Sequence, residues 1–92
     1  MQTETSTNEN FKFEVGEERA FIVPEYIEYN ATFEDVAFKM YGTRKWIYIK
    51  KFRLKLIPHQ IVVLRQTDEP VPVDSDGEIE YIDGCYYWEI VE

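Results

Sequence analysis

The sequence predicts one domain of the α+β class, because hairpin patterns at both ends flank a segment with helical periodicity. Residues 11–23 hold two alternating apolar runs around a Gly-Glu-Glu stretch, which is typical of a β-hairpin. Residues 78–91 do the same around Asp83-Gly84, a preferred two-residue turn. Residues 32–41 instead repeat their apolar side chains at helical spacing, which predicts an amphipathic helix.

The chain has 92 residues, of which 45% are hydrophobic, and this suffices for one small core. Residues 1–10 contain nothing to bury, so they predict a flexible acidic tail ahead of a single domain at 11–92. The polar start lacks a signal peptide, and no apolar run is long enough to span a membrane. We therefore expect a protein that is not secreted by a signal peptide and does not enter a membrane. Cys85 stands alone, which excludes an internal disulfide.

The predicted helix has start and stop residues of its own. Thr32 can cap it, with Asp35 three residues on in the manner of a capping box. Gly42 can end it in a left-handed conformation. The apolar positions that define the helical face are Phe33, Val36, Ala37 and Met40.

Residues 44–52 fit either a second helix or a strand, since Trp46, Ile47, Tyr48 and Ile49 favour strands. Residues 60–65 predict a central strand, and the Pro- and Asp-rich residues 67–76 predict a connection. In the C-terminal hairpin, the turn would place Trp88 in the core opposite Ile79.

The middle of the chain resembles a known family. The motifs that carry the resemblance are Thr32-Phe33, Val36-Ala37, Tyr41-Gly42, Trp46 and Pro58-His59-Gln60 followed by a strand. Over residues 26–65 the chain is similar to a LysM module, closest to the LysM-like segment of phage baseplate wedge proteins. The resemblance implies a strand-helix-helix-strand fold with a helix at 44–52. We therefore predict a helix and not a strand for these residues. Hairpins at both ends would extend this middle.

The chain departs from the LysM pattern at positions that shape the glycan-holding loops of the family. Asn30-Ala31 replaces Gly-Asp, and His59 replaces a glycine. The resemblance therefore implies the fold more than it implies sugar binding.

The sequence offers little chemistry, and we predict that the protein is not an enzyme and holds no cofactor or metal. His59 and Cys85 lack a third residue that would orient a nucleophile and its base. Asp74-Ser75-Asp76-Gly77 imitates part of a calcium loop, but strands rather than helices flank it. We predict no catalytic residues.

The charge is divided into three blocks. Residues 1–35 carry nine acids and two bases, residues 36–65 carry eight bases and no acid, and residues 66–92 carry nine acids and no base. The blocks can neutralise one another within the fold, or they can meet partners. Nucleic acid is an unfavourable partner because the net charge is −8. The candidate residues for binding an acidic protein surface are Arg44, Lys45, Lys50, Lys51, Arg53 and Lys55.

The expected function is that of a non-enzymatic structural or adaptor protein of a phage tail, baseplate or related injection machine. It would bind neighbouring protein subunits, with self-association open, and pass from the host cytoplasm into the virion. One alternative is a LysM protein that binds peptidoglycan. Another is a small acidic inhibitor that mimics DNA and acts on a host protein.

Overall fold

The protein is a single curled β-sheet in a computed structural model that describes residues 13–50 and 55–91. Strands make up 61% of the described residues, which contain no helix, so the α+β prediction is wrong. The six strands lie in the order β1-β5-β6-β4-β3-β2. Their bounds are β1 Glu18–Ile22, β2 Glu28–Asn30, β3 Asp35–Lys39, β4 Trp46–Lys50, β5 Ile61–Ser75 and β6 Glu78–Ile90.

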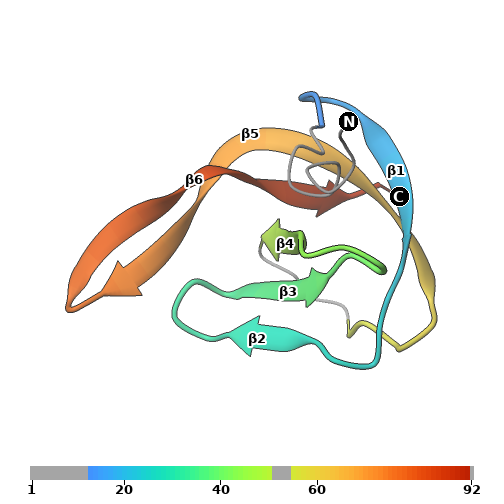
Figure 1. Cartoon of the computed structure of the whole chain (residues 1–92), viewed down its shortest axis with the longest axis horizontal. Helices are drawn as coiled ribbons and strands as arrows, with labels where there is room; N and C mark the ends of the chain where they lie inside the picture. Colours follow the sequence, from blue (N-terminus) through green and yellow to red (C-terminus); the bar gives the residue numbers. More distant parts are fainter. Residues whose placement is uncertain (1–12, 51–54, 92) are drawn as a thin grey trace, which may run out of the picture.

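The sheet curls into a half-barrel, with the long β5–β6 pair arching over β4, β3 and β2 (Figure 1). All neighbouring strands are antiparallel except β4 and β6, which run parallel. No helix in the described part is long and apolar enough to cross a membrane.

The core fills the inside of the curl around Trp88, which is 1% exposed as the sequence predicts. The rings of Phe13 and Phe21 meet the Trp88 ring edge-on, at centroid distances of 4.8 and 5.0 Å. Such T-shaped contacts add to the area that aromatic rings bury. Ile79, the predicted neighbour of Trp88, is instead 54% exposed. The rest of the buried cluster is Val23, Val36, Phe38, Ile47, Ile49, Leu56, Val62 and Leu64.

The helix predicted over 32–41 is wrong, because this segment forms a turn and β3. Asn30 and Asp35 close the β2–β3 hairpin, and Asn30 Oδ1 accepts a hydrogen bond from the Phe33 amide at 3.1 Å. Asn and Thr here serve a turn and not a helix cap, a use that those residue types share. The first four residues of β3 are buried. A strand covered on both faces shows no alternation, so its apolar residues imitate helical spacing.

The second predicted helix, at 44–52, is also wrong, and with it the strand-helix-helix-strand middle. Residues 46–50 form β4, as the local preference of its aromatic and β-branched residues favours. Ile47 and Ile49 point into the core. Gly42 does adopt a left-handed conformation (φ 78°), but it does so in the turn between β3 and β4. Residues 51–52 lie outside the described residues.

The C-terminal hairpin predicted around Asp83-Gly84 is wrong, because those residues lie within the continuous strand β6. The turn forms instead at Asp76-Gly77, where both residues have positive φ angles of 52° and 83°. Positive φ at both central residues defines a type I′ turn. This choice lets β6 pair with the whole of β5, including the part predicted as a connection at 67–76.

The N-terminal hairpin is not formed as predicted either. β1 exists, but it pairs with β5, and the described residues 13–15 form no strand beside it. Residues 14–17 form a tight turn, in which the Glu17 amide donates to the Glu14 carbonyl at 2.9 Å. Phe11 and Lys12 lie outside the described residues.

Candidate functional site

The part of the β5–β6 pair that contains its turn projects from the rest of the sheet (Figure 1). We call residues 70–82 the distal ribbon. β1 pairs with β5 over 61–65, and β4 pairs with β6 at Trp88. In the described chain, the strands of the distal ribbon therefore pair only with each other. Its register is irregular on both sides of Pro70, as expected where proline cannot donate to a ladder.

A groove of about 510 Å³ lies between the distal ribbon and the neighbouring strands, and we call it the outer groove. Three strands form one wall, and Pro72, Val73 and Asp74 of β5 form the other. The residues of the first wall are Glu28, Tyr29, Asn30 and Ala31 at β2, Asp35 and Ala37 on β3, and Tyr48 on β4. The outer groove therefore combines three carboxylates with two tyrosine rings.

Asp35 is the buried polar residue of the outer groove, with an exposed fraction of only 7%. Its Oδ2 accepts a hydrogen bond from the Tyr87 hydroxyl at 2.6 Å. This is the one hydrogen bond to the Asp35 side chain within the described residues, and no cation pairs with it there. Burial, followed by this hydrogen bond, raises the pKa of Tyr87 far above its ordinary value. Tyr87 therefore stays protonated and donates to the carboxylate.

Tyr48 and Glu28 extend this polar wall. Burial raises the pKa of Tyr48, and the charges of Cys85, Glu28 and Asp35 raise it further. Glu28 accepts a hydrogen bond from the Tyr26 hydroxyl at 2.9 Å. Negative potential therefore converges on the Tyr48 ring from more than one strand.

Four of the six predicted basic residues lie in the described part of the chain, and their printed contacts are with different neighbours. Lys50 forms an ion pair with Glu69 and lies 5.9 Å from the centre of the Tyr87 ring. Lys45 lies 5.7 Å from the Phe13 ring centre. Lys55 is exposed, and Arg44 lies in the turn before β4. Two further candidates lie outside the described residues, Lys51 and Arg53.

Three basic side chains of the described sheet, those of Arg19, Lys50 and Arg65, form ion pairs with neighbouring acids. Arg65 binds Glu18 and Glu89 across three strands at 3.1 and 2.9 Å, and Arg19 binds Glu17 at 2.6 Å. By contrast, the acids of the distal ribbon form no ion pair with any described residue. They are Asp74, Asp76, Glu78 and Glu80. The projecting ribbon therefore carries four negative charges that no described base neutralises.

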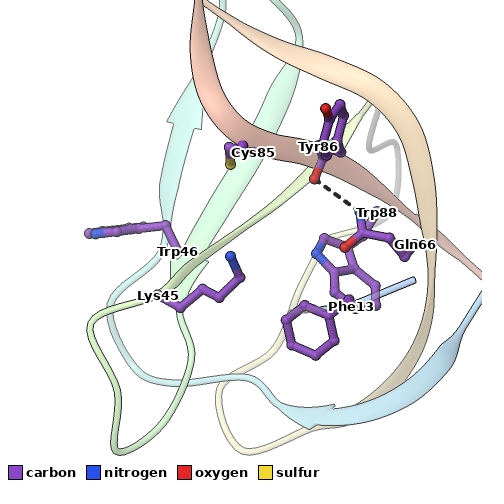
Figure 2. A pocket seen from close by; sticks show the side chains of 8 residues that line it. Phe13, Lys45, Trp46, Gln66, Cys85, Tyr86 and Trp88 are labelled. Atoms are coloured by element: carbon purple, nitrogen blue, oxygen red, sulfur yellow. Dashed lines mark hydrogen bonds between the residues drawn. The ribbon is translucent and has the colours of Figure 1, made fainter. Parts of the chain in front are cut away.

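A second pocket, of about 250 Å³, lies on the core side of β4 and β6. Figure 2 shows Lys45 reaching into it while Trp46 turns away. Gln66 closes one wall, where its amide donates to the Tyr86 carbonyl at 3.3 Å. Cys85 lines the same pocket, and burial raises the pKa of its thiol although the Lys45 charge opposes this. A thiol with a raised pKa is a poor nucleophile at neutral pH.

The other chemical candidates do not converge. His59 is in a turn, mostly exposed, with its Nε2 3.8 Å from Glu25 Oε2. Cys85 lines the pocket beside Lys45. In residues 13–50 and 55–91, no group of three or more His, Cys, Asp or Glu side chains could hold a metal ion.

Sequence reasoning missed the outer groove entirely. Its residues come from four strands, and two of those strands were expected as helices. The acidic turn at 74–77 was noticed but was not connected with Asp35 or Tyr48. No family model, curated protein or solved structure matches the chain.

Proposed function

We propose that this chain is a non-enzymatic structural or adaptor protein that binds neighbouring protein subunits through its distal ribbon. The observation that carries the proposal is the projecting ribbon itself, which exposes 54% of Ile79 and 62% of Tyr81 among acidic side chains. Exposed apolar side chains on a projecting element are typical of interaction surfaces. The strands of the ribbon also have unpaired edges in the described chain, which another strand can extend.

The charge of the ribbon supports a protein partner with basic surface. Four acids lie between residues 74 and 80 with no base among them. Charge complementarity steers association and sets the register of an interface. The same acids repel nucleic acid, so nucleic acid is not the partner that we propose.

The assembly that we propose is a phage tail, a baseplate or a related injection machine, with synthesis in the host cytoplasm and incorporation into the virion. This part rests on the sequence resemblance over 26–65. The described residues of this segment form no helix, so the support comes from the motif residues alone and not from a shared fold. Partners include other tail subunits and further copies of this chain.

A capture experiment with lysate from phage-infected cells tests the proposal. The double variant Ile79→Ser, Tyr81→Ser should fold as the wild type does but lose its protein partner. The matched control is Tyr41→Ser, Ile61→Ser, which removes two exposed apolar side chains outside the ribbon. Equal capture by the wild type and both variants would reject the ribbon as the binding surface. Co-purification with intact virions identifies the assembly.

The basic candidates provide a second arm of the same experiment. If the acidic ribbon of one copy docks on the basic segment of another, changing Lys50, Lys51, Arg53 and Lys55 together to Ser should leave a folded monomer. Wild-type association should weaken as salt rises, because salt screens exposed charges. Sedimentation across a salt series measures this. If association changes neither with salt nor with the four substitutions, these basic side chains do not take part in binding and serve only to keep the surface hydrated.

The two alternative functions give different results in the same assays. A peptidoglycan-binding protein would sediment with purified cell walls, and the tyrosines of the outer groove are a suitable surface for sugar rings. An acidic inhibitor that mimics DNA would capture a host nuclease or nucleoid protein through its ribbon carboxylates. Neither would co-purify with virions as a fixed component.

A further inference from the structure

We propose that the outer groove is a receptor for an arginine side chain of the partner protein. This inference rests on the proposed function, because it names the chemistry that the partner presents beside the ribbon. The groove is open to solvent, holds about 510 Å³, and has both negative charge and aromatic rings on its walls.

Asp35 is the first element of the argument. As a whole residue Asp35 is only 7% exposed, and its carboxylate accepts one hydrogen bond from the described residues, donated by the Tyr87 hydroxyl. It forms no ion pair with them, because Lys50, its neighbour across β4, pairs with Glu69 instead. A buried carboxylate with so few partners is costly unless a donor or a positive charge satisfies it. Because Asp35 lines the groove, a guanidinium entering the groove can supply both.

The tyrosine rings are the second element, and they favour arginine over a metal ion or lysine. Tyr29 and Tyr48 line the same wall as Asp35. A guanidinium is planar, so it can stack on a ring while it donates two parallel hydrogen bonds to a carboxylate. The ammonium group of lysine is not planar, so it cannot stack on a ring and donate two parallel hydrogen bonds at the same time. The described acids do not form a group that could hold a metal.

The third element is the position of the groove at the base of the ribbon. Pro72, Val73 and Asp74 belong both to the groove and to the distal ribbon. A partner strand or loop along the ribbon therefore passes the groove. Glu28 and Asp74 on opposite walls give a guanidinium negative charge on both sides.

The test is an NMR titration of the ¹⁵N-labelled full chain with N-acetyl-arginine amide. The isosteric but uncharged N-acetyl-citrulline amide is the control ligand. We expect saturable amide shifts confined to the groove residues with the arginine compound and no saturable shifts with citrulline. Equal binding of the two compounds, or shifts spread evenly over all acidic residues, would overturn the inference.

Matched variants locate the site. Asp35→Asn keeps an oxygen for the Tyr87 hydroxyl but loses the charge, and it should weaken arginine binding about tenfold, as expected for a hydrogen bond to a charged group. Asp76→Asn, the same change on the exposed ribbon turn, should bind as the wild type does. If Asp35→Asn fails to fold, the exposed Glu28→Gln serves in its place with a smaller expected loss. Unchanged binding by the folded groove variant would overturn the inference.

The titration tests the arginine receptor and the capture experiment tests the ribbon, so either proposal can be rejected without the other. If arginine binding is absent while the ribbon still captures its partner, only the arginine receptor is rejected. If arginine binds the groove while the ribbon variant captures partners normally, the proposed function through the ribbon is rejected.

Discussion

Strands β5 and β6 run through both the body of the sheet and the distal ribbon, but their surroundings differ between the two regions. In the body, β5 and β6 lie between β1 and β4, and Leu64 and Trp88 are almost completely buried. In the distal ribbon the same strands leave Ile79 and Tyr81 exposed. Burial of apolar area is the main source of folding free energy. The body therefore stabilises the fold, and the ribbon is free to carry a binding surface.

The boundary between the two regions is marked by polar contacts. Gln66 donates to the Tyr87 carbonyl at 3.0 Å, and Tyr87 donates to Asp35. Lys50 pairs with Glu69 just before the ribbon begins. Substitutions in the body, at the boundary and in the ribbon should therefore differ in size and in kind.

The largest effect is expected in the body, from Trp88→Ala. Removing this buried ring should destabilise the protein by about 3–5 kcal/mol, since the ring fills the centre of the core. Chemical denaturation followed by intrinsic fluorescence or circular dichroism measures the change. A loss below about 1 kcal/mol would mean that the core around Phe13 and Phe21 collapses to fill the space.

An intermediate effect is expected at the boundary, from Tyr87→Phe. The substitution removes the donor to a buried carboxylate and should cost about 1.5–3 kcal/mol. Asp35→Asn with Tyr87→Phe should cost less than the two separate losses together, because both changes remove the same contact. Additive losses in this double-mutant cycle would show that the hydroxyl and the carboxylate do not interact.

The same tyrosine predicts a pH dependence. Its pKa is raised in the folded state, so the folded protein holds this proton more tightly than the unfolded chain does. Stability from this group is complete below about pH 10, the ordinary value of tyrosine, and falls as pH rises above it. Above about pH 10, denaturation midpoints should therefore fall less steeply in Tyr87→Phe than in the wild type. Parallel midpoint curves would contradict the assignment.

The smallest effect is expected from the ion pair that joins the body to the start of the ribbon. Lys50→Ser should cost at most about 1 kcal/mol, since pairs with such exposure contribute little. Glu69→Gln should cost a similar amount. A much larger loss of stability in both variants would show that this ion pair holds the ribbon in place and contributes to the stability of the body.

The helical spacing over 32–41 shows why part of the fold could not be predicted. Interpreting the pattern as a helix requires that the segment has one buried face. In the structure, four consecutive residues of β3 are buried: Asp35, Val36, Ala37 and Phe38. Val36 and Phe38 face the core, and Asp35 and Ala37 line the outer groove. The second side is covered by residues of β5 and β6 that are distant in the sequence, with Tyr87 bonded to Asp35 and Pro72 and Val73 lining the groove beside Ala37. The site could not be predicted for the same reason.

The sequence by itself determined the local features that need no distant partner. The strand preference of residues 46–49 and the left-handed Gly42 both follow from residue type and neighbours. The burial of Trp88 was predicted too, but the rings that bury it, Phe13 and Phe21, are distant in the sequence. The tertiary structure decided between two Asp-Gly pairs that are equally good turns locally. A turn at 76–77 lets β6 pair along all of β5, whereas a turn at 83–84 would pair β6 with itself. Long-range pairing that buries a core therefore outweighs a local turn preference of about equal strength at both places.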